Sequence, residues 1–161
     1  MGFRLALLTV TFALACGAAR APGPALGTPL PSVATVDVLR RPATLAEVTR
    51  GRAALVALWA TWCTSCEKEL AALDRLQGEV GSQALVVGVA VGEPYDKVVS
   101  YLRPRGLRYH QLIDEEFALA DALGTKRVPT TLVVGKDGTV RYAGGSLDRD
   151  ALAAFRRALA E

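Results

Sequence analysis

The chain has 161 residues, of which 51% are hydrophobic, and it carries a formal net charge of +3. This length suits one ordinary domain and is short for two, and the apolar content excludes a globally disordered chain. The charge is small and the basic residues are scattered, so composition argues against a dedicated nucleic-acid-binding surface.

The first segment in chain order has the pattern of an export signal. A short basic start is followed by an uncharged apolar run over residues 5–14. Such a run is too short to span a bilayer comfortably, but it suits the apolar region of a secretion signal. Ala13 and Ala15 then form an A-x-A cleavage site directly before Cys16. We therefore predict a signal peptide over residues 1–15, with a buried N-terminal helix as the alternative.

Cys16 at this position resembles the lipobox cysteine of bacterial lipoproteins, which is acylated and becomes the mature N-terminus. The resemblance implies lipidation of Cys16, with plain removal of the signal as the alternative. Residues 16–31 are rich in Pro and Gly and predict a flexible linker, so the folded domain is expected over residues 32–161. Either form of export places the domain in the bacterial periplasm or cell envelope, where disulfides persist.

Within the domain, strands and helices are expected to alternate before a late hairpin. Residues 53–59 and 84–91 are continuous apolar runs, typical of strands covered on both faces by helices. This order predicts an α/β fold with a central mixed sheet flanked by helices on both faces. Strands are expected at 32–39, 53–59, 84–91, 109–113, 130–134 and 139–142, and helices at 44–48, 64–77, 94–103, 114–123 (capped by Asp114) and 148–159.

Cys63 and Cys66 enclose Thr-Ser at the junction of a predicted strand and helix. Cys63 falls at the first helical turn, where unpaired N–H groups and the helix dipole stabilise a thiolate. The thiolate is the attacking species in disulfide exchange. Cys66 lies one turn further on, close enough to close a ring with Cys63 and more shielded. The pair is therefore predicted to exchange disulfides.

Three other uses of the cysteine pair stay open at this point. A structural disulfide across so short a loop removes little chain entropy. A structural zinc site needs two further ligands, and the remaining candidates are Cys16 and His110, the sole histidine. A peroxide-reducing thiol needs Ser or Thr three residues before it, where this chain has Ala60.

Glu69 is the third candidate catalytic residue. It falls on the same face of the predicted helix as Cys66, and Leu70 and Leu73 mark that face as the core side. We expect partial desolvation to raise the pKa of Glu69, so that it relays protons to and from Cys66. The alternative is a solvated helix acid such as Glu67.

The segments LWATWCTSCEKEL and VPTTLVVGKDG together resemble the thioredoxin superfamily. More narrowly, they resemble its TlpA/ResA-like exported thiol–disulfide oxidoreductases, and the similarity runs from about Pro31 to the end of the chain. The resemblance implies a thioredoxin fold with an inserted helix–strand segment over residues 91–122. It also implies a cis Val128–Pro129 bond that faces the cysteines and docks the substrate, and a Trp62 side chain that shields the sulfurs.

The resemblance implies that Cys63 attacks a substrate disulfide and that Cys66 resolves the mixed disulfide with help from Glu69. No metal or organic cofactor is then needed beyond the redox-active pair. The implied direction is reductive, toward disulfides of exported proteins such as apocytochrome c, with electrons from a membrane dithiol carrier. The protein is expected to be a monomer that binds no nucleic acid.

Two departures from the family bear on the site. Ser65 occupies the place before the second cysteine where many relatives have proline, and Ala57 replaces the buried aspartate of thioredoxins. Two further functions stay open: a copper-handling chaperone that uses the dithiol and His110 as ligands, and a non-catalytic interaction module that keeps the dithiol by inheritance.

Overall fold

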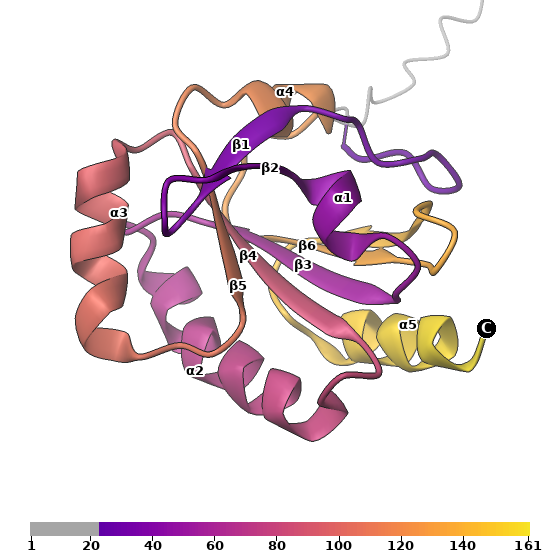
Figure 1. The fold of residues 1–161 in the computed structure, drawn as a ribbon. Coiled ribbons are helices and arrows are strands. Elements are labelled where there is room, and N and C mark those ends of the chain that lie inside the picture. Colours follow the sequence, from indigo (N-terminus) through magenta and orange to yellow (C-terminus); the bar gives the residue numbers. More distant parts are fainter. Residues whose placement is uncertain (1–22) are drawn as a thin grey trace, which may run out of the picture.

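The computed structural model describes residues 23–161, so the predicted signal peptide over residues 1–15 and Cys16 lie outside the described residues. One seven-stranded mixed sheet runs through this part of the chain in the order β2-β1-β5-β4-β3-β6-β7 (Figure 1). Its strands are β1 (Ala34–Asp37), β2 (Pro42–Thr44), β3 (Ala54–Trp59), β4 (Leu85–Val91), β5 (His110–Asp114), β6 (Thr130–Val134) and β7 (Val140–Gly144). The helices are α1 (Leu45–Thr49), α2 (Thr64–Val80), α3 (Tyr95–Leu102), the 3₁₀ turn η1 (Arg103–Arg105), α4 (Ala118–Ala122) and α5 (Arg149–Ala160).

The centre of the sheet is the parallel trio β3, β4 and β5, with β1, β2, β6 and β7 added antiparallel on either side. Every residue of β3 and β4 is buried, as the apolar runs predicted. Successive side chains of a strand point to opposite faces, so the continuous runs supply two cores rather than one. The predicted α/β sheet is confirmed.

Helices cover both faces of the sheet (Figure 1). Leu55 and Val86 pack on one face with α2 and α5, which contribute Leu73 and Phe155. The same face continues toward α3 in a cluster that contains Trp59, Val98 and both cysteines. The opposite-facing residues of β3 and β4 pack with α1 and α4. Among residues 23–161, no helix is long and apolar enough to cross a membrane.

The first strand, predicted over residues 32–39, ends earlier in the structure than predicted. β1 stops at Asp37 because the Asp37 carboxylate accepts hydrogen bonds from the backbone N–H groups of Leu39 and Arg41, at 2.8 and 2.9 Å. These bonds close a turn in which Arg40 has a φ of 60°. The chain then returns as β2, a strand that the sequence analysis missed.

The predicted helix over residues 114–123 is shorter in the structure. Asp114 is the last residue of β5, and α4 begins only at Ala118. The Asp114 carboxylate still accepts a hydrogen bond from the Ala120 N–H at 2.9 Å, so it supports the helix from outside. Phe117 precedes the helix with a φ of 60°, and its ring fills the space where a Cβ on Gly92 would lie.

Residues 23–31, which we call the strap, differ from the flexible linker predicted over residues 16–31. Gly27 N–H donates to the Val140 carbonyl at 2.8 Å, and Val140 N–H donates to the Thr28 carbonyl at 2.9 Å. Leu30 is buried in the core with α1 and α4. The strap is thus an added edge to β7 and a part of the packed domain, although its Pro and Gly content indicated a linker.

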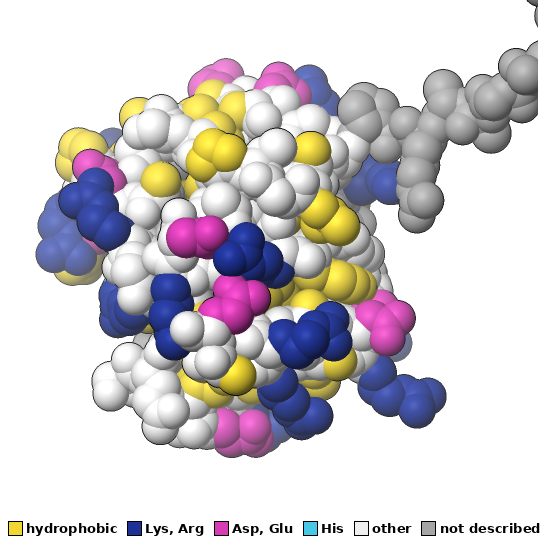
Figure 2. Space-filling model, turned by 90° about the vertical axis from the view of Figure 1, so that its right-hand side faces the viewer, with side chains coloured by type: hydrophobic (Ala, Val, Ile, Leu, Met, Phe, Trp, Pro, Cys, Tyr) yellow, Lys and Arg dark blue, Asp and Glu magenta, His cyan; other side chains and the backbone are white. Residues whose placement is uncertain are grey.

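Figure 2 shows the face of the molecule on the right-hand side of Figure 1, where the β6–β7 hairpin and the end of α5 lie. Basic and acidic side chains are intermixed on this face (Figure 2). Arg141, for example, pairs with both Asp137 and Glu161 at 3.0 Å. A surface of this kind has no extended patch of one sign.

Candidate active site

The two cysteines lie at the start of α2 and are joined by a disulfide bond. Cys63 is the N-cap residue of the helix, with extended backbone, and Cys66 lies in its first turn. The two sulfur atoms are 2.05 Å apart and the two Cα atoms 5.2 Å apart. Because β3 ends at Trp59, the chain passes directly from the buried centre of the sheet into this turn. The ring expected from the spacing is therefore formed.

The Cys63 sulfur lies where the helix carries partial positive charge. The Cys66 N–H donates a hydrogen bond to Cys63 Sγ at 3.2 Å. N–H groups and the dipole at a helix start stabilise negative charge, so reduction would leave a favoured thiolate at Cys63. Cys63 is 6% exposed and Cys66 2% exposed. Because Cys63 is the less buried of the two, its sulfur is the one that a substrate reaches first.

Ser65 adds a second polar contact to the same sulfur. Its hydroxyl oxygen lies 3.4 Å from Cys63 Sγ. A hydroxyl there can donate a charge-assisted hydrogen bond to a thiolate and so stabilise its negative charge. The sequence analysis noted Ser65 only as a departure from proline. The contact depends on the first helical turn, because the turn brings Ser65 back toward Cys63, the N-cap residue two positions before it.

Glu93 is a residue that the sequence analysis missed. Only 3% of it is exposed, yet its carboxylate accepts hydrogen bonds from the Thr61 N–H at 2.5 Å and the Thr61 hydroxyl at 2.6 Å. Lys97 Nζ lies 2.6 Å from the same carboxylate. The acid thereby holds the loop that leads into the dithiol. Its position after β4 was the available signal, because functional groups of parallel sheets gather at the carboxyl ends of strands.

The charge of Glu93 is supported by its partners. Desolvation by burial acts to raise the pKa of this carboxyl, but the bonds from Lys97 and Thr61 outweigh it and hold the pKa below its usual value. Glu93 is therefore ionised at neutral pH and fixes Thr61, two residues before Cys63, through charge-assisted hydrogen bonds.

Glu69 lies partly buried on α2, and its direct partner is a loop that the sequence analysis did not connect with it. Glu69 Oε1 accepts a hydrogen bond from the Leu147 N–H at 3.0 Å. Leu147 belongs to the connection between β7 and α5. Glu69 thus ties α2 to a segment 78 residues further along the chain. Its proposed proton exchange with Cys66 stays a prediction.

The pKa of Glu69 is raised, in the direction predicted. Desolvation by burial is the largest cause, and the negative charge of Asp148 adds to it. Hydrogen bonds from Leu147 and Ser146 act in the opposite sense and are outweighed. A carboxyl group in this state holds its proton to higher pH than a solvated glutamate.

Trp62 lies directly before Cys63 and is 65% exposed. Its predicted shielding of the sulfurs stays a prediction, and so does its predicted part in substrate binding. A large apolar ring held in solvent next to a dithiol is available to contact a bound polypeptide.

The Val128–Pro129 peptide bond is cis, as the family resemblance implied. Val128 packs against the cluster that contains both cysteines, so this loop and the start of α2 lie together. The loop is held from its other side by Thr130, whose hydroxyl donates to the Arg127 carbonyl at 2.7 Å. Residues far apart in the chain therefore meet at the dithiol.

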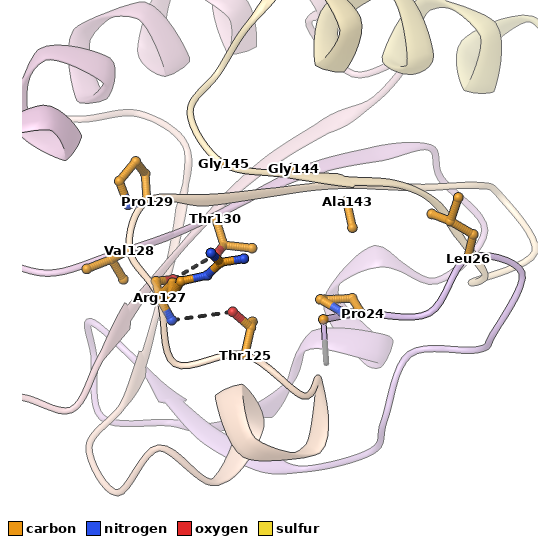
Figure 3. Close-up of a pocket in the computed structure, with 11 residues that line it drawn as sticks. Pro24, Leu26, Thr125, Arg127, Val128, Pro129, Thr130, Ala143, Gly144 and Gly145 are labelled. Atoms are coloured by element: carbon orange, nitrogen blue, oxygen red, sulfur yellow. Dashed lines mark hydrogen bonds between the residues drawn. The ribbon is translucent and has the colours of Figure 1, made fainter. Parts of the chain in front are cut away.

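A groove of about 700 Å³ begins at this loop and runs between the strap and the end of β7 (Figure 3). Pro24 and Leu26 of the strap lie on one side, and Ala143 and the following glycines lie on the other (Figure 3). The remaining lining comes from Gly23 of the strap and from the loop itself, residues 125 and 127–130. The groove thus opens from the cis-proline loop, and its lining mixes apolar residues with glycines, threonines and Arg127.

His110 does not approach the cysteines. It is the first residue of β5, is exposed, and is level with Val87 and hence with Val56 of β3. The dithiol follows the opposite, carboxyl end of β3, and each strand residue adds about 3.3 Å. In the described range 23–161, no three His, Cys, Asp or Glu side chains cluster as metal ligands would.

Comparison with known proteins adds a family and named relatives. The model of the AhpC/TSA family matches residues 26–143. The thiol-disulfide oxidoreductase ResA of Geobacillus thermodenitrificans is 30% identical over 118 residues, 73% of this chain and 67% of that protein. The thiol:disulfide interchange protein DsbE of Escherichia coli K12 is 31% identical over 96 residues, which cover 59% of this chain and 50% of that protein.

A solved structure gives the same result. The thiol:disulfide interchange protein of the thioredoxin family from Chlorobium tepidum superposes with a TM-score of 0.68 at 28% identity, over 82% of this chain and 96% of that one. The chain thus spans half to two thirds of the two curated relatives and nearly all of the solved one. This chain has a C-x-x-C disulfide in a thioredoxin-like fold, and the named relatives support oxidoreductase activity.

Proposed function

The chain belongs to the AhpC/TSA family within the thioredoxin superfamily, and on that premise we propose that it reduces disulfides of exported proteins. The resemblance stated from the two sequence motifs is confirmed at this level. The observation that carries the proposal is the Cys63–Cys66 disulfide at the start of α2, in a buried cluster against which Val128 of the cis-proline loop packs.

The proposed reaction is two successive thiol–disulfide exchanges. The Cys63 thiolate attacks one sulfur of the substrate disulfide, that S–S bond breaks, and the other substrate sulfur leaves as a thiolate that takes up a proton. Cys66, after losing its proton with help from Glu69, attacks Cys63 Sγ. The Cys63–Cys66 bond forms again and the second substrate thiolate leaves. Two electrons pass from the protein to the substrate, and a membrane dithiol carrier is proposed to restore them.

The reductive direction predicts a low reduction potential for the pair. We expect a value nearer to about −270 mV, as in thioredoxin, than to about −120 mV, as in a strong disulfide oxidant. The protein is equilibrated in thiol–disulfide buffers of stepped potential, free thiols are alkylated, and the alkylated fraction is read by mass. Cys66→Ser is the control, because it cannot form the ring. A value near the oxidant's would reject the reductive direction while leaving exchange itself in place.

Export and a lipid anchor on Cys16 form part of the proposal. They are supported by the apolar run over residues 5–14 and the small-residue site before Cys16. When the full-length gene product is made in a bacterial host, we expect the mature protein in the membrane fraction, with an acylated Cys16 at its N-terminus. Cys16→Ala is expected to lose both properties, whereas Cys66→Ala, a matched change of another cysteine, keeps them. A mature protein that begins at Cys16 with no acyl mass would contradict lipidation.

Other functions of the pair receive less support. A copper chaperone would need a ligand besides the two sulfurs, and His110 lies at the other end of the parallel strands. A peroxide-reducing site would need a hydroxyl three residues before Cys63, where Ala60 is buried and has none. A non-catalytic interaction module would also use the groove and the exposed Trp62, and it is distinguished by the absence of exchange activity. No cofactor besides the disulfide is needed for the proposed exchange.

A further inference from the structure

The strap follows β7 only part of the way. Its pairing with the strand edge runs from the Leu30 N–H, which donates to the Gly138 carbonyl at 3.0 Å, to Gly27 and Val140. Before Gly27 the chain turns, because both the Thr28 N–H and the Thr28 hydroxyl donate to the Ala25 carbonyl. The strap therefore leaves β7 at the point where the groove opens.

The groove beside the end of β7 is shaped to admit a polypeptide backbone. Ala143, Gly144 and Gly145 line it on the strand side, and a Cβ placed on Gly145 would meet no atom within 4 Å. The strand side of the groove is thus open at Gly145, whereas the space for a Cβ at Gly144 is occupied by the Tyr142 hydroxyl. An extended chain adds readily to an exposed strand edge, where backbone hydrogen bonds give affinity and side-chain pockets give specificity.

The groove carries one ionised side chain. Arg127 is the only charged residue in its lining; the others are apolar, glycine or threonine. Arg127 is exposed, and no carboxylate within residues 23–161 forms a salt bridge with it, whereas its neighbour Lys126 pairs with Asp121 at 3.0 Å. In Figure 3 the Arg127 side chain extends beside Thr130, between the cis-proline loop and the strap.

We propose that this groove binds an extended segment of the substrate, and that Arg127 selects segments with an Asp or Glu near the reacting cysteine. This proposal rests on the proposed function and names its substrate class. The groove starts at Val128, which packs against the buried cluster that contains both cysteines, so a chain bound at the dithiol can continue into it. An extended chain advances about 3.3 Å per residue, so the acidic residue is expected a few positions from the reacting cysteine. Leu26, 65% exposed on the opposite wall, offers an apolar contact.

The test uses reduced full-length protein and three fluorogenic peptides, each with one internal disulfide. The peptides differ only at the third residue outside the disulfide loop, which is Asp, Asn or Lys. Each kcat/KM is divided by the rate with bis(2-hydroxyethyl) disulfide, a small uncharged substrate, so that a general loss of exchange cancels. Wild type is expected to prefer Asp over Asn about 1.5- to fivefold, as suits one exposed charge pair. Arg127→Glu is expected to reverse the order and prefer Lys.

Lys126→Glu is the matched control, because it changes the net charge equally at the adjacent residue. It is expected to keep the preference for Asp. If both variants shift the preference equally, the preference comes from the overall charge of the protein and not from the groove, and the proposal fails. If the three peptides react equally and Arg127→Glu changes nothing, another occupant, such as this chain's own segment before Gly23, fills the groove, and the proposal also fails. If wild type reduces no peptide and no small disulfide, the proposed function itself is wrong.

Discussion

In a Cys66→Ser variant, Cys63 is expected to accumulate as a stable mixed disulfide with a substrate protein. The first exchange needs only the Cys63 thiolate, which the helix start and the Cys66 N–H stabilise. The second exchange needs a sulfur at position 66, which the structure holds within bonding distance of Cys63. Serine cannot serve in its place, because its hydroxyl is a far weaker nucleophile at neutral pH. The intermediate should therefore persist instead of decaying within the assay.

The adduct is measured by non-reducing electrophoresis and located by peptide mass after digestion. Cys63→Ser is the control and is expected to form no adduct and to lower turnover to the uncatalysed background. Cys16 is changed to Ser in both variants, so that the chain's third cysteine cannot contribute. An adduct at Cys66 in the Cys63→Ser protein, equal in yield to that at Cys63, would overturn the assignment of roles.

A Glu69→Gln change is expected to slow the resolving step about ten- to hundredfold near neutral pH, which is a modest share of what a general base supplies. Ionised Glu69 would accept the proton that Cys66 must lose, and the raised pKa brings this carboxyl closer to the working pH. Glutamine keeps an oxygen for the Leu147 N–H but cannot take up a proton. The measurement is single-turnover release of substrate from the Cys63 adduct between pH 5 and 9.

The Glu69→Gln substitution is also expected to change how the free energy of unfolding depends on pH. Burial raises the pKa of Glu69 in the folded state, so the native protein binds this proton more tightly than the unfolded chain. The resulting stabilisation is complete below the unfolded pKa of about 4.5 and is lost as pH rises through the folded pKa. Glu69→Gln should remove that pH dependence from urea unfolding of the oxidised protein.

Glu79→Gln, a change of an exposed acid on the same helix, serves as the control for both Glu69 measurements. It should behave as wild type in adduct release and in urea unfolding. If Glu69→Gln shows wild-type rates at every pH, Glu69 has no part in proton transfer. Its role would then be confined to tying α2 to the loop at Leu147.

Much of the fold follows from local pattern. The two apolar runs became the buried strands β3 and β4 because a strand with helices on both faces has no solvent side. The K-D-G turn and the terminal helix were also predicted. The errors lie at edges: Asp37 ends β1 through side-chain bonds to the following turn, and the strap gains order by adding to β7. Both effects depend on partners outside the segment concerned.

The sequence by itself determined the dithiol, its place at a helix start and the family, because each of these signals is carried by short runs of adjacent residues. Only the tertiary structure brought Glu93 into hydrogen-bond contact with Thr61, and Leu147 with Glu69. It also placed the strap and Arg127 in the lining of one groove. Each of these contacts joins segments that are distant along the chain. Their existence is set by strand order and helix packing, which no local pattern of residues specifies.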